Sequence, residues 1–358
     1  MTVSNWNGRE FILYNFRTVH EAELEKMKFG IIGCGDIAEN SFAPSLMKSE
    51  KAKLVAVCRR NYERARLFAN RFGGCKAYRS ADELIGDKGL DAVIISTPTD
   101  FHCEYTLKAA EAGLHVLCEK PMAHDRVECK RMIQACEANN VTLGVAYRRR
   151  LFPQIIKAKS LIAKGKIGRV VCVRTHYSGW SSIEPGEWRI SKRIGGAMME
   201  MAVHRLEVLL NFADTEPATV SAMVETVEQD WPVDDTNVVM IQFMNGIVGV
   251  HSTLLCSRPR RDMVQVDGTE GRIMINALEF GQSSISLEDE RGIEKIYVDP
   301  LNAPYFDLPM IDDFATAANK AKRPVCDGFT GYRVQAVVDA AFESHKTGKR
   351  ISVETITT

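Results

Sequence analysis

Regular alternation of apolar runs and helical segments is the feature that most constrains the fold of this chain. Short, wholly apolar runs predict strands buried on both faces at 29–33, 54–58, 92–96, 115–118 and 142–146. Between them, apolar residues recur at helical spacing over 37–49, 62–72, 102–112 and 126–139. Short strands joined by helices indicate a parallel sheet with helices on both faces. We therefore predict a doubly wound α/β domain in the first half of the chain.

A glycine-rich turn joins the first predicted strand to the first predicted helix. It reads Gly33-Cys34-Gly35-Asp36-Ile37-Ala38. In this pattern Gly33 permits a tight turn, Gly35 lets the backbone approach a pyrophosphate, and Ala38 allows close packing of helix on strand. The N-terminus of the helix adds free N–H groups and a favourable dipole for the anion. The turn in this context predicts a dinucleotide-binding Rossmann domain.

The residues after the second strand bear on which nicotinamide cofactor binds. NAD-binding folds usually place an acidic residue there, about 20 residues beyond the glycine turn, to accept a hydrogen bond from the ribose 2′-hydroxyl. This chain has Arg59 and Arg60 instead. Guanidinium groups suit a 2′-phosphate, so we predict NADP, with NAD as the alternative. The two arginines could also be solvated loop residues.

The composition limits the number of domains, the partners and the cellular location that can be expected for this chain. The 358 residues are enough for two domains. Lys plus Arg and Asp plus Glu number 46 each, and this balance gives no reason to expect nucleic acid or a membrane surface as the main partner. The ten cysteines form no Cys-x-x-Cys pair, which favours reduced, mostly buried thiols. No apolar run would span a bilayer and no leader pattern is present, so we expect a cytoplasmic location.

The second half of the chain has a different pattern, rich in strands. Runs at 170–175, 219–228, 238–243, 247–254 and 263–266 predict them. Asn245-Gly246 between two alternating runs is a strong hairpin signal.

Several motifs together resemble the Gfo/Idh/MocA oxidoreductase family. They are Gly33-x-Gly35-x-x-Ala38, Ser96-Thr97-Pro98-x-x-x-His102, Ala112-Gly113-x-His115-Val116-x-Cys118-Glu119-Lys120-Pro121, Trp188-Arg189 and Gly195-Gly196-Ala197. The resemblance covers the chain from about residue 28 to its C-terminus. It implies a Rossmann domain followed by an α/β domain with a large, open, mainly antiparallel sheet, through which family members often form dimers or tetramers. We accordingly expect an extension of open role at 1–26, a dinucleotide-binding domain at 27–146, and a substrate-binding and oligomerisation domain at 147–358.

The resemblance also implies the catalytic residues. Lys120 matches the family lysine that contacts the reacting hydroxyl or carbonyl, where an ammonium group stabilises negative charge on oxygen. Glu200 and His204, four residues apart, share a helix face that Glu207 continues. His204 is expected as an acid/base or hydroxyl ligand with an ordinary pKa near ~6.5. Two alternatives are structural: His204 could be a core residue with its hydrogen bonds satisfied, and Lys120 could be only a surface charge. A third is a catalytic metal on the Glu-His-Glu face. That face lacks a further ligand, so we predict no metal.

The remaining site residues are expected around the cleft. Trp188 and Arg189 match a family pair near the substrate. His176 and Tyr177, at a strand end, are polar and could reach a hydroxylated substrate. Arg258, Arg260 and Arg261 could recognise a phosphorylated or acidic sugar. The predicted cofactor contacts are Gly33, Cys34, Gly35, Asp36, Ile37, Ala38, Arg59, Arg60, Ser96, Thr97, Pro98, His102, Glu119, Lys120 and Arg149, and the predicted substrate contacts are Lys120, His176, Trp188, Arg189, Glu200 and His204.

The expected function is hydride transfer between NAD(P) and a secondary alcohol or carbonyl of a sugar, cyclitol or related polyol. Two alternatives stay open. Some family relatives hydrolyse glycosides through a transient oxidation with retained dinucleotide, and a Rossmann fold can persist in a sensor or scaffold without turnover. The presence of both Lys120 and His204 argues against a pure binding protein.

Overall fold

The computed structural model describes residues 3–6, 9–12, 25–184, 186–191, 195–278 and 284–356, with the backbone alone at 3–6, 9–12 and Trp188. In the extension, β1 (Val3–Trp6) pairs antiparallel with β2 (Arg9–Ile12). Most of the extension lies outside the described residues, and its role stays open.

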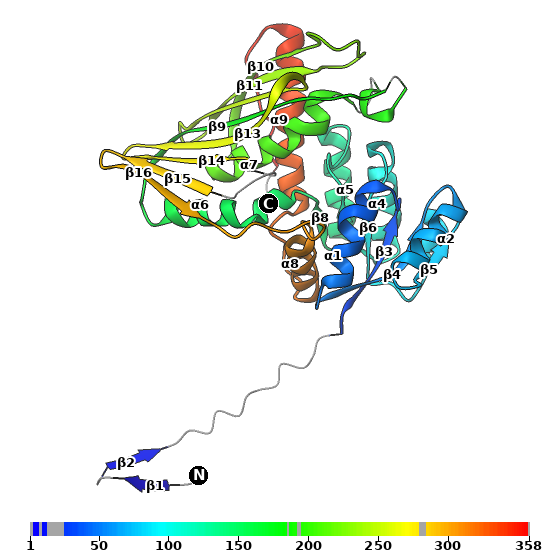
Figure 1. The fold of residues 1–358 in the computed structure, drawn as a ribbon. Coiled ribbons are helices and arrows are strands. Elements are labelled where there is room, and N and C mark those ends of the chain that lie inside the picture. The colour runs from blue at the N-terminus through cyan, green and yellow to red at the C-terminus, as the bar shows by residue number, and fades with distance from the viewer. Residues whose placement is uncertain are drawn as a thin grey trace.

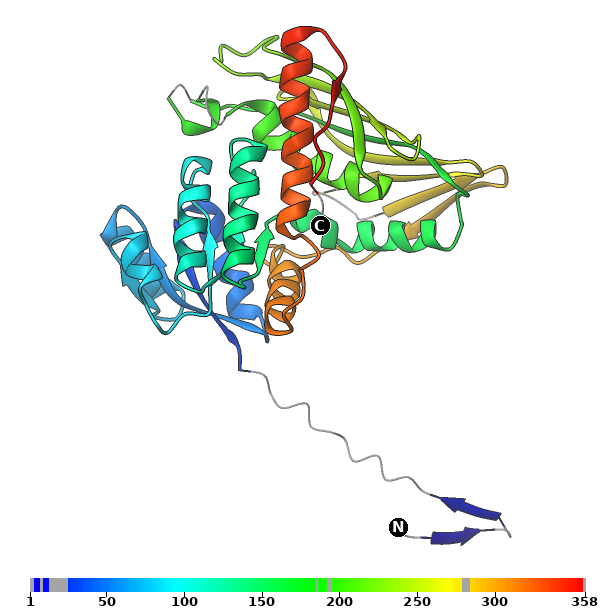
Figure 2. The same cartoon turned by 180° about the vertical axis from the view of Figure 1, so that it is seen from behind.

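The first half forms a six-stranded parallel sheet in the order β5-β4-β3-β6-β7-β8, which confirms the predicted fold class. Helices cover both of its faces (Figures 1 and 2). The strands are β3 (Met27–Ile32), β4 (Ala52–Cys58), β5 (Lys76–Tyr78), β6 (Ala92–Ile95), β7 (His115–Cys118) and β8 (Leu143–Val145), and the helices are η1 (Ala38–Phe42), α1 (Ala43–Lys48), α2 (Tyr62–Arg71), α3 (Ala81–Ile85), η2 (Thr99–Phe101), α4 (His102–Glu111) and α5 (Arg126–Ala138). The edge strand β5 and the helix α3 were not predicted, because each is too short for a periodic pattern.

The second half forms a nine-stranded sheet in the order β16-β15-β14-β13-β9-β12-β11-β10-β17. Its pairs are antiparallel except β9 with β12, so the prediction of a mainly antiparallel sheet is confirmed. The Asn245-Gly246 hairpin is confirmed as well, with Gly246 at φ +86° between β11 and β12. The strands are β9 (Val170–Trp180), β10 (Pro217–Glu225), β11 (Thr236–Phe243), β12 (Val248–Leu254), β13 (Cys256–Gly268), β14 (Arg272–Asn276), β15 (Ser284–Asp289), β16 (Gly292–Tyr297) and β17 (Ile351–Ser352).

The C-terminal part of the chain returns to the first sheet, and a simple division at residue 146 does not capture this. Helix α8 (Leu308–Asn319) packs on the first sheet, where the Phe314 ring lies 5.9 Å from that of Phe29. Helix α9 (Gly328–Thr347) contacts both sheets, and a Cβ at its Gly331 would lie 2.5 Å from Met122 Sδ. Glycine is needed there for the close approach. The remaining helices are η3 (Arg148–Leu151), α6 (Pro153–Ala163), η4 (Trp188–Ile190), η5 (Met198–Ala202) and α7 (Val203–Ala213).

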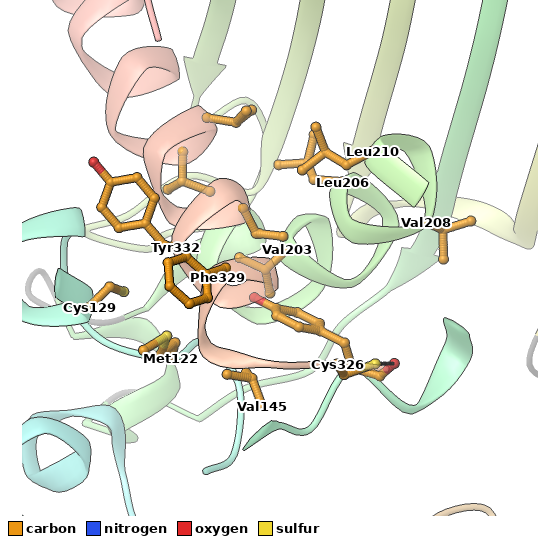
Figure 3. Packing of buried hydrophobic residues seen from close by; sticks show 14 of the residues in the cluster. Met122, Cys129, Val145, Val203, Leu206, Val208, Leu210, Cys326, Phe329 and Tyr332 are labelled. Atoms are coloured by element: carbon orange, nitrogen blue, oxygen red, sulfur yellow. Dashed lines mark hydrogen bonds between the residues drawn. The ribbon is translucent and has the colours of Figure 1, made fainter. Parts of the chain in front are cut away.

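One continuous apolar core joins the two halves. Figure 3 shows its centre, where α7 and α9 meet the end of β8 and the loop after β7. The labelled residues are Met122, Cys129, Val145, Val203, Leu206, Val208, Leu210, Cys326, Phe329 and Tyr332. Because this core fixes the helices of the second half against the first sheet, it also fixes the site between them. No helix in the described ranges is long and apolar enough to cross a membrane.

Candidate active site

The glycine turn after β3 packs tightly against the sheet at Gly33 and is open to solvent at Gly35. Gly33 has φ +93°, and a Cβ there would lie 2.7 Å from the carbonyl oxygen of Ser96. The turn is therefore pressed against the end of β6 and excludes any side chain at this position. A Cβ at Gly35 would meet no atom within 4 Å, so space is open above that residue. Ala38 is fully buried beneath the turn, as predicted for close packing of helix on strand.

Of the side chains around this turn, one forms a hydrogen bond to the turn and others are exposed to solvent. Arg59 Nη1 donates a hydrogen bond of 3.1 Å to the carbonyl oxygen of Cys34, so Arg59 braces the turn itself. Arg60 and Asp36 are exposed. Ile37 is also exposed, with 52 % of its surface accessible, although it is apolar. An exposed apolar side chain beside an open glycine turn is suited to contact a ligand that lies there.

The loops after β6 and β7 are tied together by His102. Its Nδ1 lies 2.9 Å from the carbonyl oxygen of Pro121 and its Nε2 lies 2.9 Å from that of Thr97. Burial lowers the pKa of His102, while the two carbonyl groups act in the opposite direction. The side chain is only 1 % exposed and holds the two loops together, and the prediction that it contacts the cofactor stays a prediction. The buried Oγ1 of Thr97 has no hydrogen-bond partner within the described part of the chain.

Glu119 and Lys120 follow β7 and enter the space between the two halves. Glu119 Oε2 accepts a 2.8 Å hydrogen bond from the backbone N–H of Lys120. Burial raises the pKa of Glu119 to about 7, although the neighbouring Lys120 charge acts to lower it. The Lys120 side chain is largely buried, and its ammonium lies between β7 and the helix of the second half that carries Glu200.

Lys120 and Glu200 meet across the two halves of the molecule. Lys120 Nζ donates a hydrogen bond of 3.1 Å to the backbone carbonyl oxygen of Glu200 and lies 3.8 Å from its carboxylate Oε2. Glu200 lies in η5, a π-helical turn. Such turns interrupt the regular i→i−4 pairing of a helix and are frequent at functional sites. The predicted catalytic pair is therefore brought together by tertiary structure.

The start of this helix depends on Asp234, which sequence reasoning did not identify. Its carbonyl oxygen accepts from the N–H of Ala197 and its Oδ2 from that of Met198, each at 2.8 Å. Gly196 has φ +96°, and a Cβ there would lie 2.1 Å from Asp234 Oδ1. Burial raises the pKa of Asp234 to about 6. The only signal for this role in the sequence was that Asp234 and Asp235 form an acidic pair directly before an alternating strand.

His204 lies on the same helix, half-buried, with its ring edge-on to Tyr147 at 6.5 Å. Its Nδ1 is buried and has no hydrogen-bond partner among the described residues. Burial lowers the pKa of His204 well below its usual value, and the charges of Arg149 and Lys120 act in the same direction. The pKa of His204 therefore lies below the expected ordinary value, and its surroundings disfavour the imidazolium form. In the described ranges no three His, Cys, Asp or Glu side chains cluster as a metal site requires.

Of the three arginines after β8, Arg148 and Arg150 form ion pairs with buried carboxylates. Arg150 Nε donates to Glu207 Oε1 at 2.5 Å, and the Glu207 side chain is fully buried. Glu207 thus continues the face of Glu200 and His204 as half of a buried ion pair. Arg148 Nη1 lies 3.3 Å from Asp307 Oδ1. Arg149 is 3 % exposed and contributes its charge near His204, so the prediction that it contacts the cofactor stays a prediction.

A pocket opens beside Glu200 toward the second sheet. Two aromatic residues of β9, Tyr177 and Trp180, line this pocket; the sequence suggested Tyr177 as a possible substrate contact, whereas Trp180 was not identified. The Tyr177 ring lies 4.4 Å from the guanidinium of Arg205, which is buried and donates to Asp262 at 2.7 Å. The pocket is lined by Tyr177, Gly179, Trp180, Ser181, Ile183, Arg189, Glu200, Met201, Leu255 and Arg260. Of the predicted substrate residues, Arg189 and Glu200 thus line this pocket.

His176, another predicted substrate residue, is not among the residues that line this pocket. His176 follows the pleat of β9 onto the opposite face of the sheet from Tyr177, where its Nδ1 lies 2.7 Å from Ser252 Oγ on β12. Successive residues of a strand alternate between faces, so His176 does not face this pocket, and its contact with a substrate stays a prediction. The side chain of Trp188 lies outside the described residues.

Comparisons with known proteins agree over most of the chain. The family model described as oxidoreductase family, NAD-binding Rossmann fold, matches residues 27–147, and the GFO/IDH/MocA C-terminal domain matches 155–274. D-xylose 1-dehydrogenase (NADP(+)) 2 of Haloferax volcanii is 28 % identical over 92 % of this chain and 100 % of its own. Trans-1,2-dihydrobenzene-1,2-diol dehydrogenase of Mus musculus is 30 % identical over 70 % and 75 %. The solved structure of levoglucosan dehydrogenase with NADH is similar at TM-score 0.84 and 26 % identity, over 93 % and 100 %.

Proposed function

The chain belongs to the Gfo/Idh/MocA family of oxidoreductases, and we propose on that premise that it is an NAD(P)-dependent dehydrogenase or reductase of a sugar, cyclitol or related polyol. Relatives named as dehydrogenases of D-xylose, levoglucosan and myo-inositol support this substrate class. The observation that carries the proposal is the placement of Lys120 against Glu200, beside a pocket with aromatic walls.

The residues around the glycine turn fit a nicotinamide dinucleotide. Space is open above Gly35, and the buried Oγ1 of Thr97 offers a hydrogen-bonding group that the described protein leaves unused. When bound, the dinucleotide supplies the acceptor or donor of a hydride. We assign its pyrophosphate to the turn at Gly33 and Gly35, because glycine backbone and a helix N-terminus favour phosphate.

We assign Lys120 two roles at the reacting oxygen of the substrate. It stabilises the negative charge on that oxygen, and it exchanges the proton of the hydroxyl group. Reduction of a carbonyl builds negative charge on its oxygen, and an ammonium group placed there stabilises that charge and donates the proton that completes the alcohol. In the oxidising direction the unprotonated amine takes the hydroxyl proton. Glu200 holds the Lys120 side chain at this position from the helix of the second half.

We assign His204 the role of a hydrogen-bonding partner of the substrate, and not that of the group that takes up the hydroxyl proton. A neutral imidazole carries one donor and one acceptor nitrogen, so it pairs well with a hydroxyl group. Burial and the neighbouring cations disfavour the imidazolium form of His204, which makes it a poor proton store. Lys120 therefore remains the group that exchanges the proton.

For the cofactor we propose NADP, supported by Arg60, which is exposed after β4 where an acidic residue would mark NAD. Arg59 supports the turn instead, through its bond to Cys34. The test is binding of NADP and NAD to the wild type and to Arg60→Ala. The variant should weaken NADP binding about 10-fold or more and leave NAD binding unchanged, because only NADP carries the 2′-phosphate. Equal effects on both cofactors would contradict the assignment.

We further propose a homodimer or homotetramer through the open face of the second sheet, and a cytoplasmic location, supported by ten free thiols. A lateral row on that face runs through Met223, Val238, Ser252, His176 and Met263. Met223, Val238 and the nearby Met240 are exposed. Light scattering on the purified protein tests the assembly, and Met240→Glu should shift it to monomer because a charge would be buried in the interface.

The activity is tested with a panel of polyols and keto-sugars supplied with each cofactor in both directions. Cofactor-dependent turnover that disappears in Lys120→Met supports the proposal. A wild-type protein that binds NADP tightly and turns over no substrate in the panel would favour a sensor, and product release from a nitrophenyl glycoside would favour the hydrolase.

A further inference from the structure

Two arginines follow neighbouring strands at the edge of the first sheet where its parallel strands end. β4 and β5 are parallel neighbours, with Cys58 of β4 opposite Tyr78 of β5. Helix α2 connects the two strands and packs against both (Figure 1). Arg60 comes just after the end of β4, and Arg79 comes directly after the end of β5. Because neighbouring strands lie about 4.8 Å apart, both arginines leave the sheet at the same place.

The glycine turn is hydrogen-bonded to this same edge. The backbone N–H groups of Gly33 and Cys34 donate to the carbonyl oxygen of Cys58, at 3.0 and 3.3 Å. Arg59, the next residue, donates back to the carbonyl oxygen of Cys34. In Rossmann folds the adenosine ribose lies at the end of the second strand when the pyrophosphate lies on the glycine turn. That ribose would therefore lie at the end of β4, beside the two arginines.

The side chain of Arg79 is held in place by an aromatic ring. Its guanidinium lies 4.1 Å from the centre of the Tyr62 ring. Tyr62 is the first residue of α2, and the side chain of Asn61 caps that helix by accepting from the N–H of Arg64. Stacking leaves the charge of the guanidinium and the N–H groups at its edge available. The cation is thus fixed at a helix N-terminus, where the helix dipole also favours an anion.

The charges of Arg60 and Arg79 have no counter-charge in the described part of the chain. Both side chains are exposed, and neither forms an ion pair with a described carboxylate. Glu83 accepts a 2.9 Å hydrogen bond from the backbone N–H of Arg79 at the start of α3, and not from its side chain. By contrast, Arg66 of α2 is also exposed but lies 3.2 Å from the carboxylate of Glu63. Two like charges at one edge of a sheet favour the binding of an anion there.

We propose that Arg79, together with Arg60, binds the 2′-phosphate of NADP and thereby favours NADP over NAD. This inference rests on the proposed function and adds a residue to its cofactor site. A guanidinium group offers a phosphate two N–H donors at once, in charge-assisted hydrogen bonds. NAD carries an uncharged 2′-hydroxyl in place of the phosphate, so it gains little from Arg79.

The test measures the binding of NADP and NAD to the full-length protein by calorimetry, for the wild type and for Arg79→Ala. We expect NADP to bind about 10-fold more weakly to the variant, because the lost hydrogen bonds are to a charged group, and NAD to bind with unchanged affinity. Adenosine 2′,5′-bisphosphate and AMP repeat the comparison without the nicotinamide half, and only the bisphosphate should lose affinity. The difference between wild type and variant should shrink as ionic strength rises.

Three further variants test the geometry of the site. Arg79→Lys should recover part of the loss, because it keeps the charge but loses the fork. Tyr62→Leu removes the ring beneath the guanidinium and should weaken NADP binding about 2- to 5-fold. Arg66→Ala is the matched control and should leave both affinities unchanged, because Arg66 is already paired with Glu63. Urea unfolding of each variant verifies that it is folded.

The outcomes separate this inference from the proposed function. Unchanged NADP affinity in Arg79→Ala, or an equal loss for NADP and NAD, overturns the role of Arg79 and leaves the oxidoreductase and the role of Arg60 standing. A wild-type protein that binds NAD more tightly than NADP overturns both this inference and the choice of NADP. A protein that binds neither cofactor would overturn the proposed function itself, and this inference with it.

Discussion

The ammonium nitrogen of Lys120 lies 3.1 Å from the backbone carbonyl oxygen of Glu200, although 80 residues separate the two along the chain. Lys120 follows a strand of the first sheet, and Glu200 lies in the helix that packs under the second. The contact therefore depends on how the two halves of the molecule pack together. A change that tilts the helix moves Glu200 away from Lys120 without touching either residue.

Lys120→Met should lower kcat by about 10² to 10³ or more, because one donor to the developing oxyanion is lost, while NADP affinity stays close to that of the wild type. Steady-state kinetics and fluorescence titration of the cofactor measure the two effects. Lys130→Met on α5, at an exposed position, is the control and should be neutral. Turnover that survives in Lys120→Met would remove the lysine from the mechanism.

Gly33→Ala and Gly35→Ala should impair different properties, the first the stability of the fold and the second the binding of NADP. At Gly33 the positive φ costs about 1 to 2 kcal/mol for a residue with a Cβ, and the approach to Ser96 adds to that cost, so the free energy of unfolding should fall. At Gly35 the Cβ has open space, so stability should be unchanged while NADP binds more weakly. Urea unfolding and cofactor titration on both variants measure this contrast, and the same defect in both would contradict it.

Asp234→Ala should lower the free energy of unfolding by about 1 to 3 kcal/mol, because it removes the carboxylate that accepts from the N–H of Met198 at the start of the helix carrying Glu200. Because that helix holds Lys120, kcat should fall while NADP affinity stays. Asp234→Asn keeps an acceptor oxygen and should recover part of both losses. Asp214→Asn, at the exposed far end of the same helix, is the control.

The free energy of unfolding should depend on Glu119 between pH 4.5 and about 7. Burial raises the pKa of this carboxyl to about 7 from an ordinary value of 4.5, so the folded state holds more protons than the unfolded state in that window. The contribution of Glu119 is therefore present at low pH and is lost as the pH rises toward 7.

Chemical denaturation at pH 5, 6, 7 and 8 measures this loss against Glu119→Gln, which cannot titrate. The wild type should lose stability relative to the variant as the pH rises. A relative gain would mean that the Lys120 charge outweighs burial at this carboxyl.

Sequence patterns were sufficient for every strand of the first sheet except the short edge strand β5, and for the turn at Gly33. Strands buried on both faces and helices with one apolar face are encoded by neighbouring residues, so their periodicity is visible without the fold. The pairing of Lys120 with the helix of Glu200 came from the family resemblance, since nothing local links residues so far apart. The sheet face that His176 occupies could not be predicted, because the face of a strand depends on register, and register depends on the neighbouring strands.

The sequence by itself determined the Rossmann domain, the glycine turn and the types of residue available for catalysis, because these depend on spacing along the chain. Only the tertiary structure decided that burial lowers the pKa of His204, that Asp234 starts the helix carrying Glu200, that α8 returns to the first sheet, and that Arg260 lines a pocket with Glu200. Burial, desolvation and charge proximity are set by residues that are distant in sequence and close in space. No local pattern records them.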